Sequence, residues 1–508
     1  MKIAVDLLSI RPDGSAGGAT GFALELINGF ASKQNIRVMV LCADWNVKFL
    51  RNFLPKNVQL YQVIGKHNIT GIVIIDKVLN RIRQKMQSKS ILSANGVDIL
   101  YCPFSAATYK EKGIPTVSTI LDIQHEYYPQ FFVPQELAHR RKFYQDIVKK
   151  VERVVCISDY TRDTFCEKYS FPIERTKTIY IAIQNRFSKE DDRILDRLNI
   201  RGQKYIVYPA NFWEHKNHKL LLNAFAMYVC ENKDLKLVLT GNPLENATYY
   251  ADVIKAMGIE EYVAITGYIT DEELYSILKN SKGLIYPSLF EGFGIPVVEA
   301  MHLYKLIACS NLTSLPEIGC DEIHYFNPKK PDEILRGIGF LAENEMTDSI
   351  IEKYNEKLKD YESNKMVEAY LKVFEDVLEK KEAFIFQEEV AGIYLDGWSG
   401  DEIFIQLKNR IGEKLRMKIT MPEFTRLKEK IVIRNNEKAQ WITLNPGDSY
   451  NLEEEIKDNC STITLRMSKL WSPENILKSE DKRQLGILVE SLTLESSSGE
   501  VINLKDWI

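Results

Sequence analysis

The 508-residue sequence lacks long apolar runs, paired cysteines and a marked excess of either charge, and each absence excludes a class of protein. No apolar stretch approaches the ~18 residues that a membrane-spanning helix needs. Met1 leads straight into KIAVDLL without a longer apolar region or a cleavage site, so we expect a cytoplasmic protein. The 66 basic and 70 acidic residues give a net charge of −4, which disfavours obligate nucleic-acid binding.

Cysteine is too sparse to indicate a metal site or a disulfide scaffold. The eight cysteines are scattered singly, without CxxC spacing, and their apolar neighbours predict reduced core residues. No DxD pair stands at the end of a predicted strand, and the acidic run 190–192 falls in a polar linker. We therefore expect neither a metal nor another cofactor.

The length corresponds to about three domains of ~150 residues, and 45% hydrophobic residues are typical of packed globular proteins. From residue 1 to about 380, short β-branched runs alternate with helical stretches, which predicts an α/β fold with parallel sheets. From about residue 384 on, short segments in which apolar and polar residues alternate recur at spacings of ~8–12 residues, and no helix of any length separates them. This pattern predicts an antiparallel β-sandwich. The expected domains are 1–195, 196–383 and 384–508.

The α/β part contains two series of predicted strands, separated by the polar segment 188–204. The first series comprises residues 2–8, 36–42, 58–64, 98–102, 115–121, 153–157 and 177–181. The second comprises residues 205–210, 235–241, 262–267 and 282–288. A helical stretch over 366–382 ends the α/β part.

The segment YPANFWEHKNHKLLLNAF (208–225) places Lys216 on a short loop between a strand and a helix. A lysine there can meet a phosphate as a point charge, and the helix start adds free N–H groups and a positive dipole end. Taken alone, the segment is also typical of a solvated loop lysine. We expect the nearby His215 and His218 to shape the loop around Lys216.

The segment SLFEGFGIPVVEAM (288–301) carries two glutamates eight residues apart, Glu291 and Glu299. Gly292 and Gly294 allow close approach of the backbone to a ligand, and Pro296 suits the first turn of a helix that carries Glu299. Ionised carboxylates accept charge-assisted hydrogen bonds from vicinal hydroxyls. Taken alone, either half of this segment is also typical of a plain strand-to-helix turn with an exposed glutamate.

In combination, these segments resemble the glycosyltransferase family 4 enzymes, retaining transferases with the GT-B fold, over roughly residues 1–380. The E-x7-E signature is matched from Glu291 to Glu299, and further similar stretches are 154–165, 267–288 and 310–328. The resemblance implies two Rossmann-like domains that face each other across a cleft. It also implies that the first domain holds the acceptor and the second the nucleotide-sugar donor.

The resemblance assigns roles to individual residues. Glu291 would contact hydroxyls of the donor sugar, Glu299 the ribose, and Lys216 the diphosphate, with Glu291 and Lys216 required for catalysis. The remaining residues expected to line the donor site are Asn211, Gly18, Gly292, Phe293, Gly294 and Ile295.

Two positions depart from the family pattern. Asn211 stands where the family usually has an arginine, so one cation of the phosphate clamp is missing, and the expected substitutes are His215, the Gly17-Gly18 loop and the helix start near Gly294. The segment 304–306 replaces a common Gly-x-Pro turn, which puts the loop geometry in doubt but not the class of reaction.

Two segments of the first domain are candidates for the site. The loop within 11–30 has glycines 14, 17, 18 and 21 between a strand and a helix and can approach a phosphate, although a mobile surface turn is the alternative. In DIQHEYYPQFF (122–132), His125 follows a strand at the edge where α/β sheets bind ligands. A lone histidine is often structural, but the match to the family's interdomain histidine indicates a catalytic role.

The family implies front-face displacement with retention, in which the departing diphosphate helps to deprotonate the acceptor. The donor nucleotide cannot be inferred from spacing; NFWEHKNH is similar to bacterial mannosyltransferases of surface polysaccharides, so GDP-mannose is the leading donor and UDP-sugars the alternative. A GT-B epimerase, a phosphorylase and a glycan-binding protein remain open as other functions. The expected acceptor is a glycan or a lipid-linked glycan.

Two further parts of the sequence bear on binding partners. The basic stretch 139–153 mixes its charges with acids, which favours a solvated helix face and leaves weak peripheral membrane contact open.

Four of six tryptophans lie in 384–508, and aromatic faces stack on sugars or bury a partner's surface, although core packing also explains them. Trp398, between turn residues, is the best candidate for exposure; the others are Trp441, Trp471 and Trp507. We expect this domain to hold a glycan or to mediate self-association.

Overall fold

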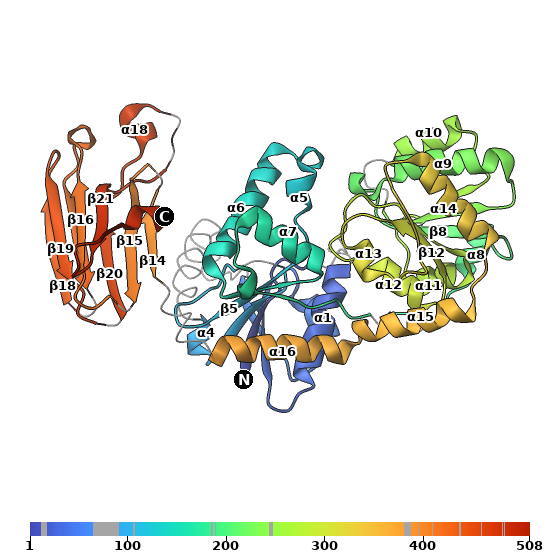
Figure 1. The fold of residues 1–508 in the computed structure, drawn as a ribbon, viewed down its shortest axis with the longest axis horizontal. Helices are drawn as coiled ribbons and strands as arrows, with labels where there is room; N and C mark the ends of the chain where they lie inside the picture. The colour runs from blue at the N-terminus through green and yellow to red at the C-terminus, as the bar shows by residue number, and fades with distance from the viewer. Residues whose placement is uncertain are drawn as a thin grey trace, which may run out of the picture. The chain divides into compact units, whose positions relative to one another are not determined.

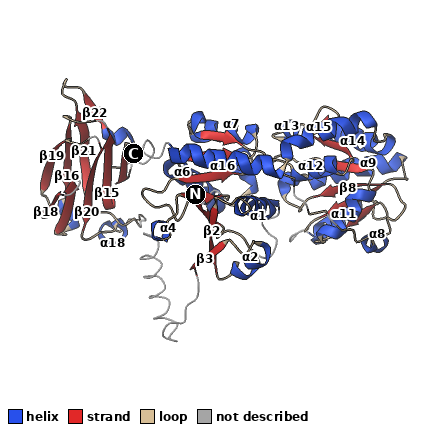
Figure 2. Cartoon of the chain, turned by 90° about the horizontal axis from the view of Figure 1, so that it is seen from below, coloured by secondary structure: helices blue, strands red, loops and turns tan. Residues whose placement is uncertain are grey.

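The computed structural model describes residues 1–11, 18–64, 91–104, 107–183, 186–187, 189–242, 247–379, 388–394, 396–408, 410–435, 438–458, 460–479, 481 and 483–507. They form two compact units, Met1–Glu379 and Lys380–Ile508 (Figure 1). Helices and parallel strands alternate in the first unit, and the second is built almost entirely of strands (Figure 2).

The first sheet of Met1–Glu379 has seven described strands, all parallel, in the order β3-β2-β1-β4-β5-β6-β7. Each overlaps one of the seven predicted runs, so this series is confirmed. The order reverses between β1 and β4, and such a reversal is where open α/β sheets bind ligands. The strands are β1 Lys2–Asp6, β2 Arg37–Ala43, β3 Gln59–Ile64, β4 Ile99–Cys102, β5 Thr116–Ile120, β6 Arg153–Cys156 and β7 Thr176–Thr178.

Both faces of this sheet are covered by helices, which explains why its strands are apolar throughout. Val155 faces a cluster with α1, whereas Val154 and Cys156 face residues of α6 and α7. We call the elements β1–β7 with their helices the first domain. Its helices are α1 Gly18–Ala31, α2 Val47–Phe53, α4 Ile91–Ala94, α5 Gln124–Tyr127, α6 Pro134–Lys150 and α7 Asp159–Tyr169.

The second sheet has six described strands, also parallel, in the order β10-β9-β8-β11-β12-β13. The four predicted strands are present, and β12 and β13 are additional. The order reverses between β8 and β11, the strands that precede the Lys216 and Glu291 loops. The strands are β8 Tyr205–Pro209, β9 Lys236–Thr240, β10 Val263–Ile265, β11 Gly283–Tyr286, β12 Leu306–Ser310 and β13 His324–Phe326.

The second sheet and its helices form the second domain, so the prediction of two Rossmann-like α/β domains is confirmed. Helix α12 begins at Ile295, has proline in its first turn, and contains the fully buried Glu299. The helices are α8 Arg193–Arg197, α9 His218–Glu231, α10 Ala247–Ala256, α11 Asp271–Asn280, α12 Ile295–His302, α13 Leu315–Ile318, α14 Pro331–Glu343 and α15 Asp348–Leu358.

Helix α16 (Ser363–Glu379) returns from the second domain and packs against α1 of the first (Figure 1). The rings of Phe374 and Phe30 lie 5.6 Å apart, and the Tyr370 hydroxyl lies 3.0 Å from Thr119 Oγ1 of β5. Apolar residues at helical spacing made this helix predictable. The chain thus crosses between the domains twice.

The unit Lys380–Ile508 is a sandwich of two antiparallel sheets, ordered β14-β15-β20-β17-β18 and β19-β16-β21-β22. Alternate residues of both sheets share one apolar core, as the period-2 pattern predicted. A five-residue helix, α18 (Pro473–Leu477), corrects the expectation that no helix interrupts the strands. The strands are β14 Glu389–Ile393, β15 Ser399–Lys408, β16 Lys414–Thr420, β17 Glu429–Asn435, β18 Lys438–Leu444, β19 Ser449–Glu455, β20 Cys460–Met467, β21 Leu488–Glu495 and β22 Val501–Asn503.

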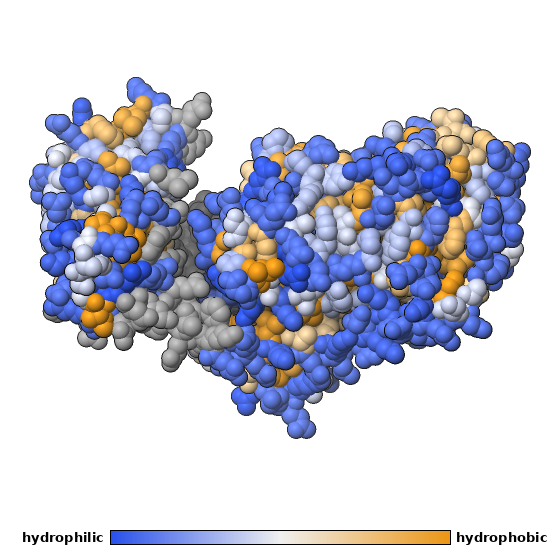
Figure 3. All heavy atoms as spheres, viewed as in Figure 1, coloured by the Kyte–Doolittle hydropathy of each residue, from blue (hydrophilic) through white to orange (hydrophobic). Residues whose placement is uncertain are grey.

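The face of the protein seen in Figure 3 is mostly hydrophilic, with small separate apolar patches. The seven cysteines whose side chains the structure describes are free; four are buried as predicted, two are half-buried and Cys230 is exposed. Within the described residues, no helix is both long and apolar enough to cross a membrane. Basic residues of 139–153 pair with acids, as expected of a solvated face: Arg140 with Glu136, and Lys150 with Asp146.

Candidate active site

The candidate site is centred on an ion pair between the two loops that follow β8 and β11. Lys216 Nζ lies 2.6 Å from Glu291 Oε1, and each side chain is only 12% exposed. The Tyr286 hydroxyl donates to the same oxygen at 3.1 Å and accepts from Lys216 Nζ at 3.3 Å. Because β8 and β11 are adjacent parallel strands, their carboxyl ends bring together residues that the sequence places far apart.

The charges of this pair support each other. Burial alone would raise the pKa of Glu291, but the charge of Lys216 and the hydrogen bonds from Lys216 and Ser288 together outweigh it, so the pKa is lowered and the carboxylate is ionised. Burial, reinforced by Lys216, lowers the pKa of His215 to about 4. The imidazole is therefore neutral at pH 7 and can offer an N–H group but not the cation that Asn211 fails to supply.

Glu299 is held by a residue that the sequence analysis did not select, Arg186. Arg186 Nε contacts Glu299 Oε1 at 2.7 Å and Nη2 contacts Oε2 at 2.9 Å, while Nη1 reaches Asp271 at the start of α11 at 2.8 Å. Burial would lower the pKa of Arg186, but Glu299 and Asp271 raise it above its ordinary value. Its position just before the polar linker carried no motif, so only the fold identifies it.

Two of the predicted glycines mark points of close approach between the two domains. A Cβ on Gly18 would lie 2.6 Å from Ile295 Cδ1, so the start of α1 meets the start of α12. A Cβ on Gly292 would lie 1.9 Å from the Leu121 carbonyl oxygen, so no side chain fits there. Gly294 caps α12 with φ +111°, a conformation that favours glycine. Gly17 lies outside the described residues.

Two predicted donor-site residues, Phe293 and Asn211, make side-chain contacts within the protein. Phe293 is buried, and its ring lies 5.7 Å from that of Tyr361 and 6.2 Å from that of Tyr180. Asn211 Oδ1 accepts from the Asn242 N–H at 2.9 Å and so joins the loops after β8 and β9. Phe293 can offer a ligand its main chain only, and the donor-binding roles of both stay predictions.

His125 lies in the aromatic core of the first domain. Its side chain is 0% exposed, Nε2 lies 2.8 Å from the Tyr169 hydroxyl, and the ring stacks on Tyr144 at 4.9 Å. Burial lowers its pKa to about 4. This placement is that of a structural histidine, the alternative named above, and its catalytic role stays a prediction.

Other residues of the same segment do reach the Glu291 loop. A Cβ on Gly292 would lie 3.1 Å from Asp122 Cβ, and burial raises the pKa of Asp122. The Tyr128 hydroxyl donates to the Leu289 carbonyl at 3.3 Å. The segment 122–132 thus lies beside the Glu291 loop through Asp122 and Tyr128.

The arrangement can bind both anions and hydroxyls. Lys216 and the N–H groups at the start of α12 offer positive charge, and Glu291 and Glu299 offer ionised or hydrogen-bonded carboxylate oxygens. No cluster of three or more His, Cys, Asp or Glu suited to a metal occurs in the part of the chain that the structure describes. The expected independence of metal stays a prediction.

Two family models match the chain. Residues 16–184 match "Glycosyltransferase Family 4" and residues 190–380 match "Glycosyl transferases group 1". Among curated proteins, O-antigen chain mannosyltransferase B of Escherichia coli is 26% identical over 43% of this chain and 58% of its own length. The MMP alpha-(1->4)-mannosyltransferase of Mycolicibacterium hassiacum is 33% identical over 39% of this chain and 47% of its own. The chain spans about half the length of the curated relatives it matches.

Solved structures share the fold at low sequence identity. Anabaena HepE, crystallised with UDP and glucose, has a TM-score of 0.56 at 16% identity and covers 74% of this chain and 100% of its own. Sucrose-phosphate synthase of Thermosynechococcus elongatus has a TM-score of 0.58 at 14% identity, over 75% of this chain and 99% of its own.

Proposed function

Residues 16–380 belong to the glycosyltransferases of the family 4 type with the GT-B fold, and from this premise we propose that the protein transfers a sugar from a nucleotide diphosphate sugar to a glycan acceptor during synthesis of a bacterial surface polysaccharide. The observation that carries the proposal is the buried pair of Lys216 and Glu291 at the point where the second sheet reverses its strand order. It offers a cation for a phosphate beside a carboxylate for a sugar hydroxyl.

Lys216 acts on the leaving group. In the free protein its charge is balanced by Glu291, and a donor diphosphate becomes its second partner. Negative charge grows on the phosphate as the glycosidic bond breaks, so a fixed ammonium lowers the barrier. Asn211 replaces the second cation of the family's clamp, so the N–H groups at the start of α12 take a larger share of this stabilisation.

The two glutamates recognise the donor. Glu291 accepts hydrogen bonds from the donor sugar, and Glu299, whose orientation Arg186 fixes, accepts them from the ribose. The family resemblance supports retention of configuration by front-face displacement, with the leaving diphosphate assisting deprotonation of the acceptor. Replacement E299Q should weaken nucleotide binding and show first in KM, and unchanged donor affinity would contradict the ribose role.

We propose GDP-mannose as the donor, because the similar curated proteins include mannosyltransferases from Escherichia coli, Salmonella typhimurium and Mycolicibacterium hassiacum. UDP-sugars are the alternative, supported by HepE, which was solved with UDP-glucose. Thermal-shift measurements with GDP, UDP, ADP and dTDP distinguish them, since a nucleotide at a hundred times its Kd stabilises by about 2.7 kcal/mol.

Turnover assays test the class of reaction. The protein is incubated with nucleotide sugar alone and then with glycan acceptors. A transferase forms a glycosylated product only with an acceptor, an epimerase converts the nucleotide sugar alone, and a phosphorylase requires phosphate. A glycan-binding protein does none of these.

The C-terminal sandwich serves in this proposal as an accessory domain that holds the growing glycan. Trp441, on the edge strand β18, is 72% exposed and faces away from the core, opposite Val432 of β17. Such a ring can stack on a pyranose. The outer face of the other sheet differs, because its charges pair with one another: Arg416 with Glu453, and Lys418 with Glu490.

The expectation that Trp398 is the exposed tryptophan was wrong. Trp398 is half-buried, and its ring packs against the buried Trp471 at 4.8 Å and against Phe424 at 6.3 Å. Two aromatic residues from distant segments thus cover it. The side chain of Trp507 lies outside the described part of the chain.

A further inference from the structure

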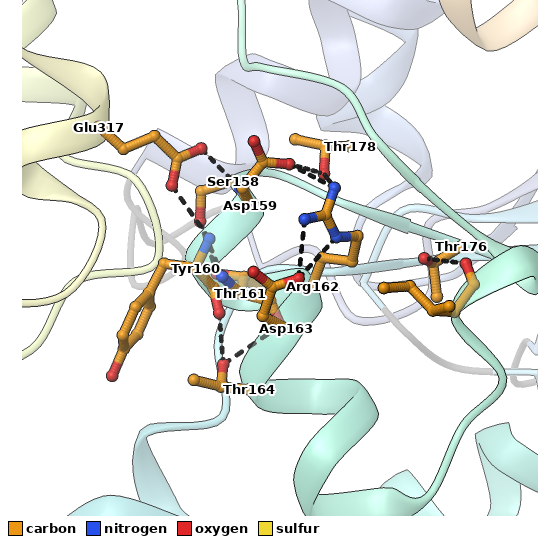
Figure 4. Close-up of polar contacts among 11 residues, drawn as sticks. Ser158, Asp159, Tyr160, Thr161, Arg162, Asp163, Thr164, Thr176, Thr178 and Glu317 are labelled. Atoms are coloured by element: carbon orange, nitrogen blue, oxygen red, sulfur yellow. Dashed lines mark hydrogen bonds and ion pairs between the residues drawn. The ribbon is translucent and has the colours of Figure 1, made fainter.

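The first turn of α7 is joined to the second domain by Glu317. The carboxylate of Glu317, on α13, accepts from the Asp159 N–H at 2.6 Å and from the Tyr160 N–H at 3.0 Å (Figure 4). Free N–H groups and the positive dipole end make the start of an α-helix a favourable place for a carboxylate. Each oxygen of Glu317 therefore holds one N–H group of the other domain.

The same turn of α7 also binds the loop that carries Glu291. The Gly292 carbonyl accepts from Ser158 Oγ at 2.7 Å and lies 3.2 Å from Thr161 Oγ1, and both hydroxyls are buried. Ser158 is in addition the N-cap of α7, since its Oγ accepts from the Thr161 N–H. One short turn of the first domain thus holds the residue that directly follows Glu291.

From its other side, the loop is held by the residues that lead into α13. The Glu291 N–H donates to Thr313 Oγ1 at 3.1 Å, and Ser314 Oγ lies 3.0 Å from the carbonyl oxygens of both Glu291 and Phe293. Glu317 lies one turn further along the same segment. The main chain at Glu291 is therefore fixed between residues 313–314 of its own domain and α7 of the other, and Glu317 ties these two supports to each other.

The charged side chains at the start of α7 bond to other groups, and the first N–H groups of the helix bond to Glu317. Asp159 Oδ1 is occupied by Arg162 Nη1 at 2.7 Å and by the Thr178 hydroxyl at 2.6 Å, which anchors the turn to β7 (Figure 4). Arg162 also pairs with Asp163 on its own helix. The turn is thus rigidly attached to the first domain, and a movement of that domain is transmitted to Gly292.

We propose that Glu317 is a positioning residue that couples the contact between the two domains to the placement of Glu291 for catalysis. The effect of Glu317 on catalysis rests on the proposed function, whereas its effect on the position of the Glu291 loop rests on the structure alone. When Glu317 releases α7, the support at Gly292 loosens and Glu291 loses its fixed position, while Glu299 keeps its contact with Arg186 and Lys216 its contact with the Tyr286 hydroxyl. Catalysis is sensitive to such small displacements, and the contacts that remain preserve the affinity for the nucleotide.

Hydrogen–deuterium exchange on the full chain without ligand tests whether Glu317 holds the Glu291 loop in place. The variant E317Q keeps the shape of the side chain but loses the charge and one acceptor. It should speed exchange about tenfold or more in the peptides covering 158–165 and 289–297. S158A, which removes the bond to Gly292 together with the N-cap bond to the Thr161 N–H, should speed exchange in 289–297 and in the first turn of α7. The control D163N, whose carboxylate pairs within α7, should change neither. Unchanged exchange of 289–297 in E317Q would overturn the coupling.

Kinetic measurements on the same variants test whether Glu317 affects catalysis. E317Q should lower kcat for sugar transfer about 10- to 100-fold while the Kd for nucleotide changes less than about twofold. An E317Q enzyme with wild-type kcat would overturn the positioning role. If the wild-type protein transfers no sugar at all, the proposed function fails, and the exchange measurements still decide whether Glu317 holds the Glu291 loop.

Discussion

Arg186 grips both carboxylate oxygens of Glu299, with Nε at 2.7 Å from one and Nη2 at 2.9 Å from the other. Glu299 is 1% exposed, so without this partner its charge would be buried and uncompensated. The guanidinium fork also fixes the plane of the carboxylate. A single arginine from the segment between the sheets therefore fixes the orientation of the Glu299 carboxylate.

Replacement R186A should weaken nucleotide binding about tenfold, because an unpaired buried carboxylate favours its neutral form and loses its orientation. R186K, which cannot form the fork, should recover only part of the affinity. Isothermal titration with the nucleotide that binds best measures the effect. The control R193A removes an arginine that is 90% exposed and pairs only with its near neighbour Asp191. Equal affinity in R186A and R193A would refute the role of Arg186.

The buried histidines make stability depend on pH. His218 stacks on Phe212 at 4.0 Å, and burial lowers its pKa from 6.5 to about 3. Between these values the unfolded chain binds a proton that the folded chain does not, so stability falls as the pH falls. From pH 7 to pH 5, wild type should lose about 2 kcal/mol more stability than H218F, which cannot titrate there.

Thermal unfolding at the two pH values measures this difference. All other titrating groups are common to both proteins and cancel. H139Q, at an exposed position, serves as the control and should behave as wild type. If wild type and H218F respond equally to pH, His218 is not held neutral by burial.

Activity should survive treatment with EDTA. The described residues contain no ligand cluster for a metal, and Lys216 together with the N–H groups of α12 provides the positive charge that a metal would otherwise bring. Transfer rates before and after chelation give the answer. Loss of activity that manganese or magnesium restores would show that the site needs a metal after all.

Removal of residues 384–508 should leave transfer to short soluble acceptors and impair transfer to long ones or change the oligomeric state. W441A in the full chain should impair long acceptors selectively, because only the exposed ring is lost. Chain-length profiles and light scattering check both variants. A folded truncated protein that transfers to nothing, or one that matches the intact chain in every respect, contradicts the division of labour.

The sequence predicted the strands with long apolar runs and the loops with a recognisable motif. It failed for β13, which has only three residues, two of them half-buried, and for α18, which is a single short turn. It also failed for β12, although the five buried residues of this interior strand carry the apolar signal expected of a parallel strand.

Within the site, motif residues were predictable and their partners were not. Lys216 and Glu291 were selected from two separate motifs, but their pairing with each other was not predicted, and Arg186 and Glu317 likewise act through contacts between distant segments. The placement of His125 in an aromatic core depends likewise on tertiary packing. For Trp441 a signal existed, because Ile442 and Leu444 occupy the inward parity of β18 and leave Trp441 outward.

The role of Lys216 is tested most directly by the rate of sugar transfer by K216A, measured with a nucleotide sugar and an acceptor that the wild-type protein uses. K219A, which removes a lysine paired with Glu214 at the surface, is the matched control. We expect that K216A folds, that K219A keeps the wild-type kcat, and that the barrier in K216A rises by about 2–4 kcal/mol, a loss of roughly 10²- to 10³-fold in kcat. A folded K216A protein with wild-type kcat would show that Lys216 does not stabilise the leaving group.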